Sequence, residues 1–165
     1  MTTTELYLIR HGLAGEHGTY KNDGDRPLTP EGIRKTQQVA KRLVELGVQF
    51  EMILTSPYAR AFQTAEILQS TGLSQQLETS PNLLPEGDFE DWFSWFEGWQ
   101  SVGQKALAIV GHEPNLGQWA EFLLWGEVRN RLKLKKAGII GINVPLDDPI
   151  SNSELFLLVP PKVLL

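Results

Sequence analysis

The sequence predicts an α/β fold: a single three-layer domain spanning residues 1–165, with a mostly parallel central sheet, helices on both faces and an antiparallel edge strand. Short, continuous apolar runs bounded by polar or turn-forming residues are typical of strands buried on both faces of a sheet. Over the first three-quarters of the chain these runs alternate with amphipathic helical stretches, as in parallel βαβ units. The last two apolar runs are separated only by a turn, which predicts the antiparallel edge.

The composition fits one globular enzyme or binding domain. A chain of 165 residues with 41% hydrophobic residues can bury a single core. The absence of cysteine excludes disulfides and thiolate metal sites. A net charge of -5 argues against nucleic acid as the main partner. No apolar run is long enough to span a bilayer and no signal peptide is visible, so we expect a cytoplasmic monomer with no membrane partner.

The chain opens with a strand, a loop and a helix. Leu6 to Arg10 is the expected strand. The polar segment from Gly12 to Arg26 is either a mobile flap beside a site or a plain surface loop. Thr29 and Pro30 suit the start of a helix, and Gly47 suits its end. The apolar face of that helix is expected to carry Ile33, Ala40, Leu43 and Val44.

A second strand and helix follow in the same order. Phe50 to Thr55 is apolar enough for a buried strand. Ser56 is expected to cap a helix that Pro57 opens and that ends near Gly72. The buried face of this helix would consist of Tyr58, Ala61, Phe62, Ala65 and Leu68. A short strand is expected next, at Leu77 to Pro81.

The segment after this strand is rich in aromatic residues. Leu84 to Asp88 is a turn, and Phe89 to Trp99 is expected to be helical. Four of the aromatic side chains share one helical face, which fits either a helix packed on the sheet or a surface for a partner. They are Trp92, Trp95, Phe96 and Trp99.

The remaining chain predicts three strands and one helix. Ala106 to Val110 is a strand and Glu113 to Trp125 is an amphipathic helix. Arg129 to Lys136 is strongly basic, and fits either a solvated strand or loop or a contact for an acidic partner. The last two strands are expected at Gly138 to Val144 and at Glu154 to Val159.

Two of the three histidines come directly after buried strands. His11 follows the first strand and His112 follows the run that ends at Gly111. In open α/β sheets the ligand crevice lies at the carboxyl ends of the strands. A lone histidine in such a place is usually structural, whereas two of them at strand ends favour catalysis. His17 lies in the polar loop and shows no such placement.

Four sequence blocks resemble the histidine phosphatase superfamily, the phosphoglycerate mutase-like family. They occur in the order that is typical of the family and span about two-thirds of the chain. With Leu13-Ala14 after the first block, the chain is most similar to the SixA-type phosphohistidine phosphatases. The blocks are Arg10-His11-Gly12, Leu28-Thr29-Pro30-Glu31-Gly32, Ser56 to Ala65 and Gly111-His112.

The resemblance implies a catalytic set. His11 would be the nucleophile that forms a phosphohistidine intermediate. Arg10, Arg60 and His112 would hold the phosphoryl oxygens, with His112 protonated and donating. Nearby arginines would also keep the nucleophile unprotonated at neutral pH. Arg60 itself would lie in the first turn of a helix, where a cation is unfavourable unless an anion binds there.

Further expectations concern the rest of the site. Gly12, within the first block, and Arg26, which could reach the site from the flap, are expected to bind substrate. No Cys, no pair of His at i, i+4 and no EF-hand-like loop is present, so no metal or cofactor is expected, and 165 residues leave no room for an inserted lid subdomain. Larger members place an acidic residue after the third strand to protonate an alkoxide. Glu86 lies in roughly that region, with Asp88 as the next candidate, and either side chain fits an exposed turn equally well.

The expected substrate is phosphohistidine on a signalling protein, such as a histidine phosphotransfer domain. Imidazole leaves more easily than an alkoxide because its pKa is about 6.5. A site without a dedicated acid therefore suits phosphohistidine better than a phosphate ester. Two alternatives are a small-molecule phosphomonoesterase on the same fold and a phosphate-recognising binding module without turnover.

Overall fold

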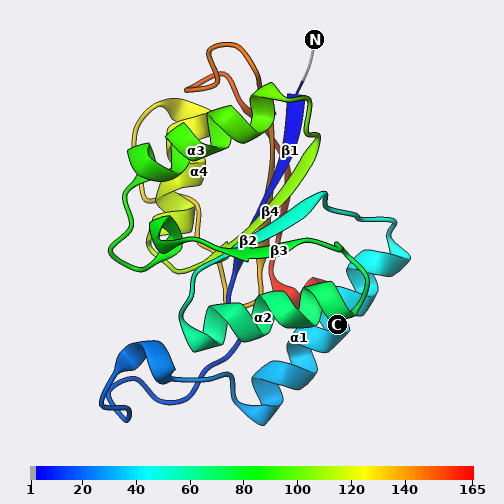
Figure 1. Ribbon diagram of the computed structural model, residues 1–165, viewed down its shortest axis with the longest axis vertical. Helices are drawn as coiled ribbons and strands as arrows, with labels where there is room; N and C mark the ends of the chain where they lie inside the picture. The colour runs from blue at the N-terminus through cyan, green and yellow to red at the C-terminus, as the bar shows by residue number, and fades with distance from the viewer. Residues whose placement is uncertain (1–2) are drawn as a thin grey trace.

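The computed structural model describes residues 3–165, which form one six-stranded sheet with helices on both faces (Figure 1). The strands are β1 (Thr3–Arg10), β2 (Met52–Thr55), β3 (Leu77–Thr79), β4 (Ala106–Gly111), β5 (Ile139–Pro145) and β6 (Glu154–Val159). The helices are α1 (Pro30–Glu45), α2 (Ala59–Ser70), α3 (Phe89–Ser101) and α4 (Asn115–Trp125). No helix within residues 3–165 is long and apolar enough to cross a membrane.

The strand order is β3-β2-β4-β1-β5-β6. The strands β3, β2, β4 and β1 are mutually parallel, β5 is antiparallel to β1, and β6 is antiparallel to β5. The predicted α/β fold with a mostly parallel sheet is therefore confirmed, and the antiparallel pairing lies at the β5–β6 side. The carboxyl ends of β1, β2 and β4 meet at one edge of the sheet.

Alternating side chains of β1 divide the core into two layers. Leu6 and Leu8 point to the face that α3 and α4 cover, whereas Tyr7 and Ile9 point to the face that α1 and α2 cover. Figure 1 shows these helix pairs on opposite sides of the sheet. The β1 strand is thus buried on both faces, as its continuous apolar run predicts.

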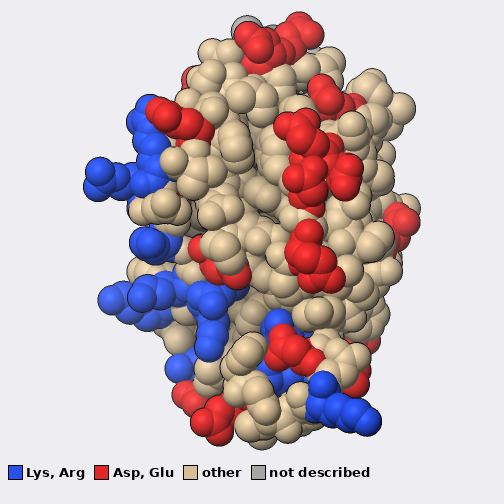
Figure 2. All heavy atoms as spheres, turned by 90° about the vertical axis from the view of Figure 1, so that its left-hand side faces the viewer, with Lys and Arg blue, Asp and Glu red and all other residues tan. Residues whose placement is uncertain are grey.

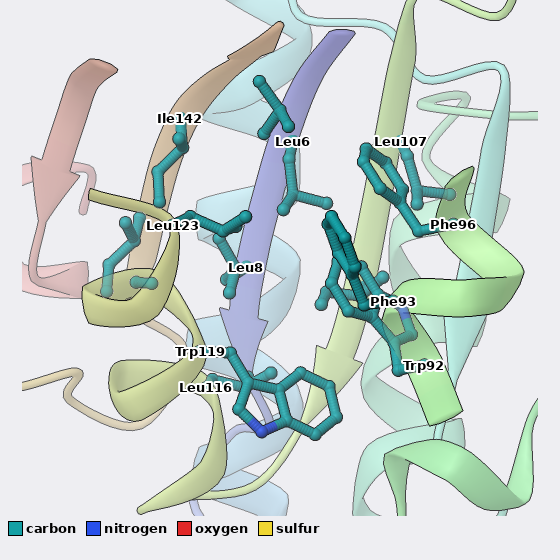
Figure 3. Close-up of a cluster of buried hydrophobic side chains, with 14 of the residues drawn as sticks. Leu6, Leu8, Trp92, Phe93, Phe96, Leu107, Leu116, Trp119, Leu123 and Ile142 are labelled. Carbon is teal, nitrogen blue, oxygen red and sulfur yellow. The ribbon is translucent and has the colours of Figure 1, made fainter. Parts of the chain in front are cut away.

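The aromatic helix α3 packs on the sheet. Trp92 and Phe96 are fully buried, and the Trp92 ring stacks on Trp119 of α4 with centroids 5.4 Å apart (Figure 3). Trp95 and Trp99 are partly buried against the same cluster. Most of the aromatic surface is therefore core.

The buried face of α1 differs from the expected one. Ile33 and Val44 are 37% and 42% exposed, and Thr36 is buried in their place. The reason is a close approach at Gly12, where an added Cβ would lie 2.4 Å from the Thr36 hydroxyl oxygen. A hydrophobic pattern does not detect a threonine that packs against a glycine.

The start of α2 also differs. Tyr58 is its N-cap, and the helix begins at Ala59 rather than at Pro57. The hydroxyl of Ser56 accepts a hydrogen bond from the Tyr58 N–H, but its second contact is with His112. Ser56 therefore belongs to the loop at the end of β2, and the predicted cap was wrong.

Candidate active site

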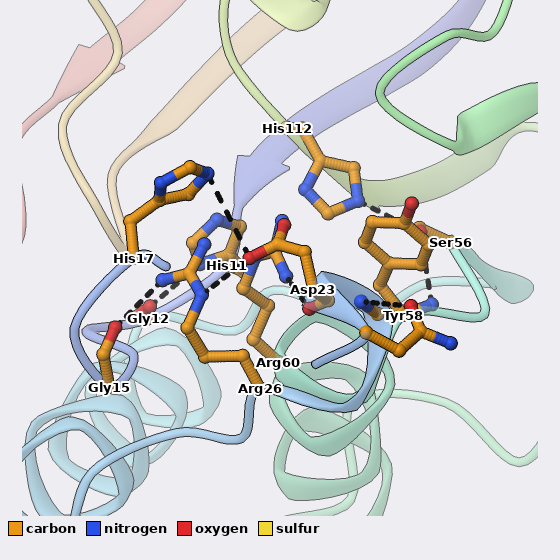
Figure 4. A network of polar contacts seen from close by, with 12 residues as sticks. His11, Gly12, Gly15, His17, Asp23, Arg26, Ser56, Tyr58, Arg60 and His112 are labelled. Carbon is orange, nitrogen blue, oxygen red and sulfur yellow. Dashed lines mark hydrogen bonds and ion pairs between the residues drawn. The ribbon is translucent and has the colours of Figure 1, made fainter. Parts of the chain in front are cut away.

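The strand register places the two histidines side by side. Arg10 of β1 pairs with Gly111 of β4, so His11 and His112 leave two adjacent parallel strands together. The two imidazole centroids are 5.3 Å apart, and the residues are 6% and 3% exposed. Figure 4 shows both rings at the edge where β1 ends. The sequence placed each histidine at a strand end, and the structure brings them together.

The orientation of the His11 ring is fixed by its neighbour. Nδ1 of His11 lies 2.7 Å from the Gly12 carbonyl oxygen, an acceptor, so Nδ1 carries the proton and donates it. The lone pair of a neutral ring is then on Nε2. An imidazole in this tautomer has one nitrogen free to attack an electrophile.

Burial keeps the His11 imidazole neutral. Desolvation is the largest effect, and together with the charges of Arg60, Arg10 and Lys136 it lowers the pKa of His11 from 6.5 to about 3, against an opposing hydrogen bond to Gly12. A protonated ring has no lone pair to donate. The ring is therefore unprotonated at neutral pH, with burial rather than the nearby arginines as the main cause.

Burial keeps His112 neutral as well, whereas the protonated donor expected from the resemblance belongs to a site that holds a phosphoryl group. Burial, then His11 and Arg60, lowers the pKa of His112 to about 3. Nε2 of His112 lies 2.9 Å from the Ser56 hydroxyl oxygen, and that hydroxyl also accepts from the backbone of Tyr58. If Ser56 donates to Nε2, Nδ1 carries the proton, and Nδ1 is buried without a partner within residues 3–165. The neutral ring can thus still donate to a phosphoryl oxygen.

This protonation state gives a direct expectation for NMR. The Cε1–H resonances of His11 and His112 should stay constant between about pH 5 and 8, where an ordinary imidazole titrates. Because both pKa values are lowered, protonation of the folded protein should begin only as the pH approaches 3. A midpoint near 6.5 for His11 would contradict the role of burial.

Arg60 lies in the first turn of α2 and faces the two histidines. It is 4% exposed, and its guanidinium donates to the backbone oxygen and to a carboxylate oxygen of Asp23 at 2.9 and 3.0 Å. Its centre also lies 5.0 Å from the Tyr58 ring centroid. A cation at a helix start is favourable when an anion is bound to it, and here that anion is a carboxylate.

The loop between β1 and α1 brings Arg26 into the same cluster. Arg26 is 8% exposed, and it donates to Asp23 Oδ1 at 2.9 Å and to the Gly15 carbonyl at 2.8 Å. The Asp23 carboxylate therefore lies between two guanidinium groups, as Figure 4 shows. The hydrogen bond from Arg26, with Arg60 beside it, lowers the pKa of Asp23 and keeps it ionised.

Arg10 and Gly12 lie on either side of His11 in the chain, and both form hydrogen bonds within the protein. The Arg10 guanidinium donates to the Leu134 carbonyl at 3.0 Å, and its charge lowers the pKa of both histidines. The Gly12 N–H donates to the Thr64 hydroxyl at 3.0 Å, and the Gly12 carbonyl accepts from His11. Both polar groups of Gly12 are thus engaged within the protein.

Glu86 and Asp88 lie in an exposed turn before α3. The Asn115 side chain, at the start of α4, donates to the carbonyls of Leu84 and Pro85 at 3.2 and 3.1 Å. The turn is therefore tied to the chain three residues after His112. Neither carboxylate forms a hydrogen bond or an ion pair with another side chain within residues 3–165.

Sequence reasoning missed two residues of the cluster, Asp23 and Ser56. Ser56 follows β2, the strand beside β4, and a search for polar residues after every strand would have found it. Asp23 has no comparable signal, because it reaches the site from a long polar loop. Its contact with Arg60 joins positions 37 residues apart.

The Asp23 carboxylate occupies guanidinium donors of Arg26 and Arg60 that are also suited to a phosphoryl group. We expect Asp23→Asn to tighten binding of vanadate or phosphate by about 3- to 10-fold, because a charge-assisted bond that is partly exposed contributes modestly. Inhibition constants would measure this. Asp25→Asn, at an exposed position of the same turn, is the control. Weaker anion binding by the Asp23 variant would show that Asp23 instead holds Arg60 in place.

The cluster is cationic without a metal-ligand set. Within residues 3–165 no group of three or more His, Asp or Glu side chains could hold a metal ion. Positive charge comes instead from Arg60, Arg26 and Arg10. Two buried neutral imidazoles beside such cations are chemically suited to bind a phosphate group and to accept a phosphoryl group.

Comparisons with known proteins agree with this chemistry. The chain is 45% identical over 163 residues to an uncharacterised protein of Picosynechococcus sp., covering 98% of this chain and 99% of that protein. It is 29% identical over 124 residues to the phosphohistidine phosphatase SixA of Escherichia coli, covering 74% and 76% of the two chains. The solved structure of the protein histidine phosphatase SixA complexed with tungstate matches with a TM-score of 0.85 and 25% identity, covering 98% and 99% of the two chains.

These relatives support a phosphatase activity. Residues 6–121 match the family model of the histidine phosphatase superfamily (branch 1). The matched segment includes His11 and His112, and also Arg10, Arg26 and Arg60. The chain therefore belongs to the histidine phosphatase superfamily, branch 1.

Proposed function

We propose that the protein is a phosphohistidine phosphatase that acts on a signalling protein, such as a histidine phosphotransfer domain, through a covalent intermediate on His11. The observation that carries the proposal is the His11 imidazole itself. It is buried and neutral, its Nδ1 is bound to the Gly12 carbonyl, and its Nε2 is free beside Arg60 and His112. A residue with a merely structural role would need neither the free nitrogen nor the surrounding cations.

In the first step the phosphoryl group moves to the enzyme. Nε2 of His11 attacks the phosphorus, and the P–N bond to the substrate imidazole breaks. The substrate ring carries a proton from solvent on its other nitrogen, so it keeps the electron pair of the broken bond and leaves as neutral imidazole. Arg60, Arg26 and the Nδ1–H of His112 stabilise the phosphoryl oxygens, and Asp23 must give up its place on the guanidinium groups.

In the second step water attacks the phosphorus of the modified His11. The enzyme P–N bond breaks, inorganic phosphate leaves, and the neutral ring is restored. The hydrogen bond from Nδ1 to Gly12 supports this, because it stabilises positive charge on the ring while Nε2 is phosphorylated.

The leaving group supports phosphohistidine as substrate. Imidazole has a pKa near 6.5 and departs without a strong acid, whereas an alkoxide requires one. Glu86 and Asp88 are exposed and lie outside the buried cluster. The similarity to SixA points to the same substrate class.

A comparison of substrates tests the proposal. Turnover should be measured with histidine phosphotransfer domains phosphorylated by phosphoramidate, with free phosphohistidine and with aliphatic phosphate esters. We expect the phosphohistidine substrates to have the higher kcat/KM. A strong preference for an aliphatic ester would instead identify a small-molecule phosphomonoesterase, and binding without turnover would identify a recognition module.

Activity should not depend on a divalent ion. Arg60 and Arg26 supply the positive charge at the phosphoryl oxygens, so we expect EDTA to leave the rate unchanged and vanadate or tungstate to inhibit. The assay is turnover of phosphohistidine before and after chelation. Loss of activity that a divalent ion restores would contradict this expectation.

A further inference from the structure

The loop between α4 and β5 carries exposed cations beside the site. We propose that this basic ridge, defined as residues Arg129–Lys136, docks carboxylate groups on the protein that presents the phosphohistidine. The inference rests on the proposed function and adds that the surface of the substrate protein carries negative charge beside the phosphohistidine.

The ridge is the most basic part of an acidic protein. Five of the 15 Lys and Arg residues lie within its eight positions, and it contains no Asp or Glu, although the net charge of the chain is -5. Figure 2 shows Lys and Arg gathered along one edge of the face formed by α3 and α4, with Asp and Glu gathered on a separate strip. Most of the Lys and Arg on this face thus lie apart from the acidic strip, although Arg129 of the ridge pairs with Glu127 at 2.9 Å.

A buried carboxylate holds the backbone of the ridge. Glu121 of α4 is 1% exposed and accepts hydrogen bonds from the backbone N–H groups of Arg129, Asn130, Arg131 and Leu132, at 2.5 to 2.8 Å. Burial alone would raise the pKa of Glu121, but these four donors outweigh burial and lower it. The start of the ridge is therefore a fixed structure rather than a loose loop.

Side chains of the ridge alternate between buried and exposed from Arg131 to Lys135, although this segment is not a strand. Leu134 is buried in the α3–α4 core and Leu132 is partly buried against it, whereas Arg131, Lys133 and Lys135 are exposed. None of these three cations forms an ion pair within residues 3–165. The fold thus holds three exposed cations toward solvent without an ion-pair partner in the described residues, although burial raises the pKa of Glu113 and the nearby charge of Lys133 opposes that rise.

The ridge ends at the active site. The Leu134 carbonyl accepts from Arg10, and the Ala137 N–H donates to the carbonyls of Arg10 and His11 at 3.0 and 3.1 Å. Lys136 is close enough for its charge to lower the pKa of His11. A protein whose phosphohistidine reaches His11 therefore brings its neighbouring surface over Lys133 and Lys135.

Carboxylates on a protein fit this row better than nucleic acid does. The ridge is short and the rest of the chain is acidic, which opposes a long phosphate backbone. Complementary charge around a phosphohistidine would instead speed encounter and set orientation.

Two synthetic phosphohistidine peptides of equal length, one flanked by Asp and Glu and one by Ser and Gly, test the proposal. The wild type should hydrolyse the acidic peptide with a kcat/KM about 10-fold higher at low salt, mainly through KM, and high salt should reduce the difference. Lys133→Glu with Lys135→Glu should abolish the preference and leave the neutral peptide unchanged. Lys41→Glu with Lys105→Glu, the same charge change at exposed lysines elsewhere, should keep it.

Each of the following outcomes would overturn the proposal for the basic ridge. Equal rates on both peptides, or an equal loss on both in the Lys133 and Lys135 variant, would show that the cations recognise no acidic partner. Inhibition by duplex DNA that depends on the same lysines would assign the ridge to nucleic acid. Failure to hydrolyse either peptide or free phosphohistidine would reject the proposed function, and the ridge proposal with it.

Discussion

Replacing His11 with alanine should reduce turnover roughly 10⁴- to 10⁶-fold, the range seen when a catalytic nucleophile is removed. The variant loses Nε2, the nitrogen that receives the phosphoryl group, and the hydrogen bond to Gly12. The strands that hold His11 are kept by their own backbone pairing and by a core on both faces. The fold should therefore persist, and circular dichroism and thermal unfolding would check it.

The matched control is His17→Ala. His17 has a side chain that is 82% exposed, and its nearest charged partner, Asp23, is 3.9 Å away. Its loss should leave most activity. A folded His11→Ala protein with the wild-type rate would reject the nucleophile and with it the covalent mechanism.

If Glu86 protonates an alkoxide leaving group, as the resemblance to larger family members implies, Glu86→Gln should lower hydrolysis of an alkyl phosphate ester by about 10²- to 10⁴-fold, the usual contribution of a general acid. Phosphohistidine hydrolysis should fall much less, because imidazole is a far weaker base than an alkoxide. Both rates should be taken as single-turnover phosphorylation of His11, since hydrolysis of the intermediate is common to both substrates. Asp88→Asn, in the same exposed turn, is the control.

The rates with the two substrates distinguish three roles for the carboxylates of this turn. An equal fall with both substrates would place Glu86 in binding or in activation of water. No change in either rate would leave Glu86 as an exposed turn carboxylate. If Asp88→Asn lowers the ester rate and Glu86→Gln does not, the general acid is Asp88 rather than Glu86.

The edge of the sheet that holds the site could be predicted because it depends on local patterns. A buried strand followed by histidine occurs twice, and parallel strands end at one edge. That β1 and β4 are neighbours, with Arg10 opposite Gly111, depends on the sheet order, which no local pattern contains. The 5.3 Å between the rings is a consequence of that register.

The predictions for α1 and α2 were wrong where a polar side chain contacts a residue that is distant in sequence. Thr36 is buried against Gly12, so the α1 face is rotated away from Ile33 and Val44. Ser56 binds His112 instead of capping α2. In both places a polar side chain meets a partner that is distant in sequence, and periodicity cannot show that partner.

The protonated His112 expected from the resemblance stays a prediction, because it concerns a site that holds a phosphoryl group. The expected protonated ring assumes a bound phosphoryl dianion, whereas the pKa of about 3 reflects burial beside His11 and Arg60. The Asp23 carboxylate is the anion that the cluster holds in the structure, and it came from a loop without a recognisable pattern.

Isolation of the phosphorylated enzyme tests the central claim most directly. The protein should be mixed with a phosphohistidine substrate, quenched under alkaline conditions within one turnover, and analysed by mass spectrometry of its peptides. We expect one acid-labile phosphoryl group on His11, absent from His11→Ala and from enzyme that was not exposed to substrate. Phosphate on another residue, or steady turnover with no phosphorylated enzyme at any time, would contradict it.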